Sequence, residues 1–305
     1  MKLYIIGNGF DLAHGMPTKY WDFRTYLDNL YPNFLSSFEE HYYIYHGDSD
    51  KYKKDLLWNN FETNLANIDE DIIIEDALAM EMGLESGDYG IEEPLRIYFR
   101  NEYQYINKLA KYLKQWVRTI KLKDAKPLTS FIDKANNDYY VTFNYTSVLE
   151  NVYKIPSADI LHIHGSLHEY TDDPILGHGN LKRIQDIQEK KANAETYYNE
   201  KEMSICTVIE EYYKTTFKNI NNYMHKLNRL CAHDFTEIIV VGHSVAGIDL
   251  PYFKTVDECT NRELVWNVHY YAESEKEKMR NALESQGIDS NRIQLISNSE
   301  FYIEK

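Results

Sequence analysis

The sequence predicts an α/β fold, a doubly wound and mostly parallel sheet with helical insertions. The first sign is a short apolar run, Leu3–Ile6, that ends at once in a glycine turn, as the first strand of an open parallel sheet does. The second is that later apolar runs are continuous rather than alternating, which is typical of strands buried on both faces. The third is that helical segments separate these runs, as connections between parallel strands require.

The composition is that of a globular protein. With 305 residues and a hydrophobic share of 43%, the chain can bury a sizeable core in one large domain or two small ones. The formal net charge of −15 argues against general binding of duplex DNA, because Lys and Arg side chains supply most of that affinity. The cysteines lack Cys-x-x-Cys spacing, which argues against a disulfide framework and a zinc ribbon. With no signal peptide and no apolar run long enough to span a membrane, we expect a cytoplasmic protein without a membrane partner.

The glycine turn after the first strand is the most informative motif. Gly7 and Gly9 would let the backbone approach a pyrophosphate, with the N–H groups of the next helix facing it. The strict dinucleotide fingerprint places its third glycine three residues after the second. Here the segment Phe10–Leu12 fills that space and the third glycine is Gly15, so the strict fingerprint fails.

Two stretches of the chain predict helices rather than strands. The first, at about 21–122, includes an apolar helical face from Leu57 to Leu65 and a long amphipathic helix from Tyr98 to Ile120. The second is a charged excursion at about 181–233. We expect residues 1–305 to form a single domain in which the first insertion is a lid or wall over the carboxyl edge of the sheet. A protein-interaction module is the alternative for this insertion.

The later predicted strands, 139–143, 160–163, 175–176, 237–241, 265–271 and 292–296, complete the sheet. Ser274 and Glu277 predict a capping box for the helix before the last strand. Four of these strands end in polar residues or glycines that would gather at one edge of the sheet. The residues at these strand ends are Asn144, His164 with Gly165, Gly177 with His178, and Gly242 with His243 and Ser244.

These motifs resemble two groups of proteins. Gly7, Gly9, Gly15 and Pro17 stand at the offsets of the first turn of sirtuins. The longer motif Gly-Asn-Gly-Phe-Asp-Leu-Ala-His-Gly, followed by Pro-Thr-x-Tyr, more closely resembles the AbiH family of bacterial phage-defence proteins. The resemblance implies a sirtuin-like, Rossmann-like core that binds NAD or a related nucleotide in abortive infection.

The resemblance also implies roles for the strand ends. Thr142–Asn144 matches the sirtuin Thr-x-Asn, Leu161–Gly165 matches the strand that ends in His-Gly, and Gly242–Ser244 matches a nucleotide-contacting Gly-small-Ser turn. By this likeness Asn144 positions ribose and water, and His164 is the base that assists hydrolysis of the nicotinamide–ribose bond. The residues implied to hold the nucleotide are Gly7, Asn8, Gly9, Phe10, Asp11, Gly15, Gly165, Gly242, His243 and Ser244.

The chain also departs from the sirtuin pattern. Thr146 replaces an aspartate two residues after the asparagine, so a carboxylate must come from elsewhere or is not needed. The zinc cysteines of the deacylases are absent, so protein deacylation is not expected. Glu150 matches a glutamate of bacterial defence proteins. Glu62 would reach the nucleotide pocket, or it stays at a solvated rim or pairs with a lysine.

Other classes of function remain open. A non-enzymatic sensor would bind the nucleotide and change its contacts with a partner, such as a second copy or a phage-derived trigger. A metal-dependent nuclease would need ligands, and those that could contribute are Asp11, His162, His164, His168, His178 and His243. Their spacing matches no recognised zinc motif, so we expect no metal. These histidines could equally be packed core residues or caps of backbone carbonyls.

Overall fold

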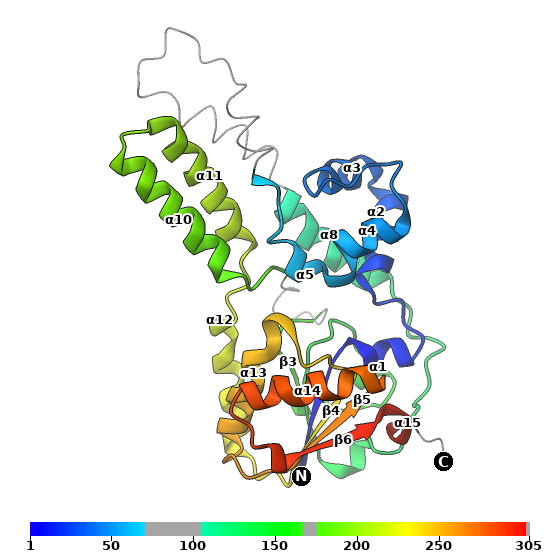
Figure 1. Cartoon of the computed structure of the whole chain (residues 1–305). Coiled ribbons are helices and arrows are strands. Elements are labelled where there is room, and N and C mark those ends of the chain that lie inside the picture. The colour runs from blue at the N-terminus through cyan, green and yellow to red at the C-terminus, as the bar shows by residue number, and fades with distance from the viewer. Residues whose placement is uncertain (71–104, 167–175, 303–305) are drawn as a thin grey trace. The chain divides into compact units, whose positions relative to one another are not determined.

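A computed structural model describes residues 1–70, 105–166 and 176–302, which belong to two compact units (Figure 1). The sheet unit comprises Met1–Asp22, Leu113–Ile175 and Asn219–Lys305. The helical unit comprises Phe23–Tyr112 and Leu176–Lys218. The helical unit thus combines most of the first predicted insertion with the first part of the second. The single-domain organisation and the lid stay predictions.

The sheet unit is built on six parallel strands, which confirms the predicted α/β class with a mostly parallel sheet. Their order is β3-β2-β1-β4-β5-β6. The strands are β1 (Lys2–Ile6), β2 (Tyr139–Thr142), β3 (Ile160–His162), β4 (Glu237–Val241), β5 (Trp266–Tyr270) and β6 (Ile293–Ser297).

The strand predicted at 175–176 is wrong at Leu176, the one residue of the two that the structure describes. Leu176 lies in no strand, and Ile175 lies outside the described residues. His178 instead forms an isolated bridge with Phe217. Its backbone N–H donates to Thr216 O at 2.8 Å, and its carbonyl accepts from Lys218 N at 2.8 Å. This short segment therefore pairs within the helical unit and adds no strand to the sheet.

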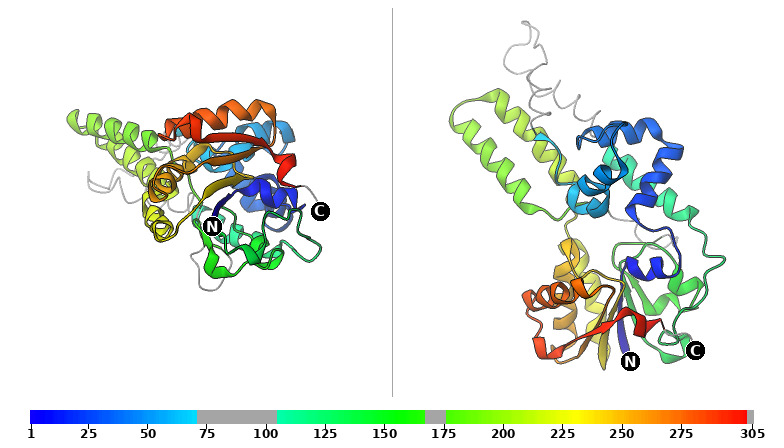
Figure 2. Two further views of the ribbon diagram at one scale, coloured as in Figure 1. Left: turned by 90° about the horizontal axis from the view of Figure 1, so that it is seen from below. Right: turned by 45° about the vertical axis from the view of Figure 1, so that its right-hand side comes forward.

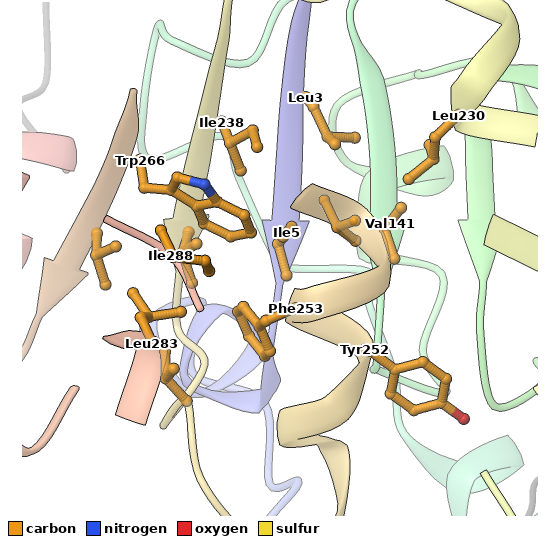
Figure 3. Packing of buried hydrophobic residues seen from close by; sticks show 14 of the residues in the cluster. Leu3, Ile5, Val141, Leu230, Ile238, Tyr252, Phe253, Trp266, Leu283 and Ile288 are labelled. Carbon is orange, nitrogen blue, oxygen red and sulfur yellow. The ribbon is translucent and has the colours of Figure 1, made fainter. Parts of the chain in front are cut away.

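Both faces of the sheet are buried, which explains why its strands read as continuous apolar runs. Leu3 and Ile5 pack in one core cluster, whereas Tyr4 and Ile6 pack in another, because successive strand residues point to opposite faces. Figure 3 shows the first cluster, in which Phe253 packs with Ile5 and other strand residues. Helices thus have an apolar surface to cover on either side.

Among the described residues, six helices lie wholly within the sheet unit, and Figure 2 shows the chain from two further sides. They are α1 (Asn8–Ala13), α9 (Val148–Asn151), α12 (Asn221–Met224), α13 (Leu250–Cys259), α14 (Glu273–Ser285) and α15 (Asn298–Phe301). Residues of α13 and α14 join the cluster of Leu3, and residues of α1, α9 and α15 join the cluster of Tyr4. The predicted cap of α14 is wrong by two residues. Ala272 is the N-cap, and the Glu275 side chain accepts from its N–H at 3.2 Å.

The remaining α-helices are α2 (Tyr20–Leu30), α3 (Pro32–Glu40), α4 (Asp50–Leu56), α5 (Phe61–Asn64), α8 (Tyr105–Thr119), α10 (Leu181–Thr196) and α11 (Glu200–Thr216). The described residues also form 3-10 turns: η1 (Trp58–Asn60), η2 (Lys134–Asn136), η3 (Ser157–Asp159), η4 (His225–Ala232), η5 (Gly247–Asp249) and η6 (Ser290–Arg292). The helix predicted at Tyr98–Ile120 corresponds to α8, and residues 98–104 lie outside the described residues. No helix of the described ranges has the length and apolarity to cross a membrane.

The helical unit has its own aromatic core. The rings of Trp58 and Phe61 stack with centroids 4.6 Å apart, and Phe38 contacts both rings edge-on. The face predicted from Leu57 to Leu65 is buried as expected, although η1 and α5 carry it rather than one helix. Beneath these rings Glu39 accepts hydrogen bonds from Arg24 Nε and from Trp58 Nε1, both at 2.7 Å. A buried ion pair therefore anchors this core.

Four strands of the sheet end level with one another. Ile6 pairs with Thr142 and with Val241, and Thr142 pairs with His162. The residues that follow these strands therefore start from one edge of the sheet, as predicted. The strand order reverses between β1 and β4, and ligands of open α/β sheets bind outside the carboxyl ends of the strands at such a reversal.

Candidate functional site

Three glycines bring the loops after β1 and β4 into backbone contact. Gly7 N donates to Val241 O at 3.0 Å, and Gly9 N donates to Gly242 O at 2.7 Å. A Cβ atom on Gly7 would lie 2.5 Å from the Gly242 oxygen, and one on Gly242 would overlap the Phe10 nitrogen. Gly242 also has φ +68°, a conformation that disfavours a side chain. The close approach of two loops thus explains these glycines without a ligand.

The other residues of the predicted phosphate cradle have varied surroundings. The Phe10 ring is fully buried, 4.5 Å from the His14 ring, whereas Asn8 is exposed and donates to Thr18 O at 2.9 Å. Gly15 has φ +73° and open space around it. The Phe10 N–H donates to Gly7 O at 3.0 Å, so this N–H and that of Gly9 already have partners. A pyrophosphate at this turn stays a prediction.

Asp11 and Asn144 form the centre of a buried polar cluster at the carboxyl edge. Asp11 is 1% exposed, and its Oδ1 accepts from Asn144 Nδ2 at 2.8 Å. Its Oδ2 accepts from the Thr146 hydroxyl at 2.5 Å. Asn144 Nδ2 also donates to Gly7 O at 3.1 Å. The cluster therefore joins the turn after β1 to the segment after β2, and Asp11 places a carboxylate beside Thr146.

The orientation of the Asn144 amide follows from these contacts. Both partners of Nδ2, the Gly7 carbonyl and the Asp11 carboxylate, offer acceptor atoms, so the nitrogen and not the oxygen must face them. Asn144 Oδ1 is buried and has no hydrogen-bond partner among the described residues. Buried polar atoms are usually paired, so an acceptor of this kind is a candidate ligand contact.

His162 and Glu150 support the backbone of Asn144. His162 Nε2 lies 2.8 Å from Glu150 Oε1, and Nδ1 lies 3.1 Å from Asn144 O. Both ring nitrogens thus lie next to oxygen atoms that can accept a hydrogen bond. Asn144 N in turn donates to the Thr142 hydroxyl at 3.1 Å. The main chain at Asn144 is therefore fixed on both sides.

Burial raises the pKa of the Asp11 carboxyl from its ordinary 3.8 to about 7. Hydrogen bonds from Thr146 and Asn144 and the nearby His162 oppose this shift, while Glu150 adds to it. The native protein therefore binds a proton more tightly than the unfolded chain between about pH 4 and 7. The stability that this proton contributes is present at low pH and is lost as the pH rises through 7.

We expect the Asp11→Asn protein to lack this loss, because asparagine keeps the shape of the side chain without a titrating proton. Relative to Asp11→Asn, the free energy of unfolding of the parent should fall by up to about 4 kcal/mol between pH 4 and 8. Urea unfolding at pH 4, 5, 6, 7 and 8 measures the difference. The exposed Asp234→Asn change is the control and should follow the parent. Parallel curves for the parent and Asp11→Asn would contradict the prediction.

His164 lies in a second polar cluster at the same edge. Its Nε2 is 3.3 Å from the Tyr252 hydroxyl and 3.4 Å from Asp249 Oδ1. The Phe143 ring packs edge-on against His164 and against His243. Asp249 therefore lies within ion-pair distance of the His164 ring.

The loop after β4 borders this second cluster. His243 Nδ1 accepts from Val245 N at 2.9 Å, which fixes its ring, while Ser244 is exposed. Val245 has φ +50°, a rare conformation for a β-branched residue. On the other side of the cluster, Gly165 takes φ +84° directly after His164. Glycine is well suited to that turn.

The predicted catalytic pair is therefore brought to one edge, but each member has its own partners. Asn144 contacts Gly7 and Asp11, and His164 contacts Tyr252 and Asp249. Phe143, which precedes Asn144, packs against the core cluster of Leu3, because successive residues of an extended chain point to opposite faces of the sheet. The roles of both residues stay predictions.

The proposed metal ligands do not gather. Across residues 1–70, 105–166 and 176–302, no three His, Cys, Asp or Glu side chains are grouped to hold an ion. His168 lies outside the described residues, and His178 belongs to the helical unit, where burial lowers its pKa to about 4. In that unit Glu62 Oε1 lies 3.3 Å from Lys218 Nζ, so Glu62 pairs with a lysine, which was one of the three possibilities expected for it.

Sequence reasoning did not assign several residues of the two clusters. It treated Thr146 as a missing carboxylate, and it gave no role to Asp249 or Tyr252. Because alternate residues of an extended chain share a face, Thr142 and Asn144 could have been grouped from their spacing, whereas the chain bends at Tyr145 and Thr146. Asp249 and Tyr252 come after the loop that follows β4, and the sequence gives no comparable indication that they would reach this edge.

A comparison with protein families found a match over most of the chain. The family model described as bacteriophage abortive infection AbiH matches residues 3–270. No curated protein is significantly similar to the chain. The matched range contains both polar clusters and the whole helical unit.

Proposed function

Because the chain belongs to the AbiH family of bacteriophage abortive infection proteins, we propose that it acts in phage defence by binding NAD or a related nucleotide. The observation that carries this proposal is the side-chain oxygen of Asn144, a buried acceptor that has no hydrogen-bond partner among the described residues and suits a ribose hydroxyl. The strand order, with its reversal between β1 and β4, supports a Rossmann-like or sirtuin-like core. Gly7 and Asp11 hold the Asn144 amide, and Gly242, His243 and Ser244 border the site from the loop after β4.

The proposed reaction is hydrolysis of the nicotinamide–ribose bond. Water adds to C1′ of the ribose, the bond to the nicotinamide nitrogen breaks, and free nicotinamide and ADP-ribose leave. Asn144 orients the ribose and the water. His164, oriented by Asp249 at 3.4 Å, accepts the proton that the water releases. General-base assistance of this kind contributes roughly 10²–10⁴ in rate.

A nucleotide sensor without catalysis is the second candidate. It is favoured by the separate hydrogen-bond partners of Asn144 and His164, because a hydrolase needs both groups at one bond. In the sensor, the nucleotide contacts Asn144 alone and changes the contacts of the protein with a partner. A metal-dependent nuclease has no such support from the described residues.

The decisive experiment follows nicotinamide release from NAD by chromatography. We expect release by the parent, and a loss of at least about 100-fold in Asn144→Ala and His164→Ala. The exposed Asn151→Ala and His225→Ala changes are matched controls and should keep the activity. All five proteins are compared at equal folded fraction, judged by their thermal unfolding.

The alternatives give different outcomes. If the parent releases no nicotinamide but NAD raises its melting temperature, the sensor replaces the hydrolase. If only Asn144→Ala loses activity, the nucleotide site stands and the role of His164 as base is wrong. If NAD causes neither release nor a shift in melting temperature, the nucleotide proposal is abandoned.

A further inference from the structure

We propose that Asp11 is a positioning residue of this site: its ionised carboxylate holds the Asn144 amide so that Oδ1 faces a hydroxyl donor of the ligand. The identity of the ligand as a nucleotide rests on the proposed function, whereas the coupling of Asp11 to Asn144 does not. Asp11 is too deeply buried to be assigned a contact with substrate, so it acts through Asn144.

The first step concerns the atom that meets the ligand. Asn144 is 7% exposed, and its Nδ2 is committed to Gly7 O and Asp11 Oδ1. The remaining atom, Oδ1, accepts hydrogen bonds and cannot donate them. It therefore suits a hydroxyl or amine of the ligand and not an unprotonated phosphate oxygen. In a nucleotide, the ribose hydroxyls are donors of this kind.

The second step concerns what holds the amide. The carboxylate of Asp11 receives two hydrogen bonds, both from uncharged donors, Asn144 and Thr146. Hydrogen bonds to an ionised acceptor are stronger than those between neutral groups. Ionised Asp11 therefore restrains Asn144 more firmly than a protonated Asp11 does.

The third step concerns protonation. The Thr146 hydroxyl can turn and accept a proton placed on Asp11 Oδ2, whereas Asn144 Nδ2 can only donate. Protonation thus leaves Asn144 with a neutral acceptor. The Asp11→Asn change gives the same hydrogen-bond pattern at every pH, because its amide can donate to Thr146 and accept from Asn144.

Other groups that titrate surround Asp11. His162 from β3 and Glu150 from α9 act on its charge, and Tyr302, which follows α15, has its pKa raised by burial and by nearby groups including Asp11. His14 at the end of α1 lies edge-on to Tyr302, with ring centroids 6.3 Å apart. All four remain in Asp11→Asn, so a pH dependence that belongs to them persists in that protein.

The test measures the affinity of ADP-ribose by calorimetry between pH 5.5 and 8.5. ADP-ribose keeps the ribose hydroxyls and has no nicotinamide to lose. We expect the affinity of the parent to rise about fivefold with pH, as a neutral hydrogen bond gives way to a charged one. Asp11→Asn should bind at the low-pH level of the parent throughout. Asp11→Ala, which has no acceptor for Asn144, should bind at least about tenfold more weakly, and Asp234→Asn should follow the parent.

A second readout needs no ligand. In NMR spectra, the side-chain amide resonance of Asn144, assigned by its loss in Asn144→Ser, should shift with pH in the parent and stay constant in Asp11→Asn. This readout also shows that Asp11→Asn is folded.

The outcomes separate the two proposals. If ADP-ribose binds with the same pH dependence in the parent and in Asp11→Asn, the positioning role is wrong while the nucleotide site stands. If ADP-ribose does not bind at all but the Asn144 resonance titrates only in the parent, the coupling stands and the nucleotide is wrong. A resonance that does not respond to pH in the parent overturns the positioning role in either case.

Discussion

Gly242→Ala is expected to cost at least about 3 kcal/mol of stability, more than a positive φ alone explains. An alanine at φ +68° pays about 1–2 kcal/mol for its backbone conformation. Its Cβ would also overlap Phe10 N and lie 2.8 Å from Gly9 C, both of which are backbone atoms that a rotamer change cannot move. The loops after β1 and β4 would have to separate, and the Asp11 cluster would lose its support. Urea unfolding measures the cost.

Matched glycines isolate the contribution of the loop contact. Gly247 and Gly287 have similar backbone angles, φ +71° and +87°, but no atom lies within 4 Å of a Cβ placed on either. Gly247→Ala and Gly287→Ala should therefore cost only about 1–2 kcal/mol. If all three variants are equally destabilised, the backbone angle alone explains the effect, and the close packing of the two loops contributes nothing to the free energy of unfolding.

Glu39→Ala is expected to cost about 3–5 kcal/mol, because it removes one partner of a buried ion pair. Glu39 binds Arg24 through two hydrogen bonds, at 2.7 and 3.0 Å, and it also accepts from Trp58 Nε1. Without Glu39, the Arg24 charge and the Trp58 N–H lose this acceptor while they stay buried. The Arg24 side chain is only 9% exposed. Equilibrium unfolding in urea, followed by tryptophan fluorescence, gives the change in free energy.

The neighbouring residue provides the control. Glu40 lies on the same helix, α3, but is exposed, so Glu40→Ala should change stability by no more than about 0.5 kcal/mol. Glu39→Gln should fall between the two, because an amide oxygen still accepts from Trp58 but carries no charge for Arg24. A loss below about 1 kcal/mol in Glu39→Ala would show that water or rearrangement compensates Arg24.

The sheet could be predicted from the sequence because its strands carry strong local signals. Buried runs such as Leu3–Ile6 and Glu237–Val241 are continuous, and each ends in a glycine. The level ends of the strands follow from parallel pairing, so the gathering of Asn144, His164 and Gly242 at one edge was predictable too. The strand predicted at 175–176 had only two apolar residues, and the backbone that pairs is that of His178, within the helical unit.

The partition of the edge into two clusters could not be predicted. It depends on how the chain turns after each strand, and positive backbone angles at Gly165, Gly242 and Val245 set those turns. The sequence does not reveal that Val245 takes this conformation, because valine prefers extended structure. The same limit applies to Asp249 and Tyr252, which reach His164 only through the loop after β4.

The pairing of β1 has a consequence for how the protein folds during its synthesis. Lys2 pairs with Glu237, so the central strand waits for a neighbour made about 235 residues later. At a synthesis rate of about 5–20 residues per second, this wait lasts roughly 10–50 s. Gly7 and Asp11 emerge from the ribosome early. Their contacts with Asn144 need about half of the chain, whereas the contact of Gly9 with Gly242 needs most of it. A chain that ends before β4 therefore cannot form the contact between the loops after β1 and β4, and the candidate site stays incomplete until most of the protein has been translated.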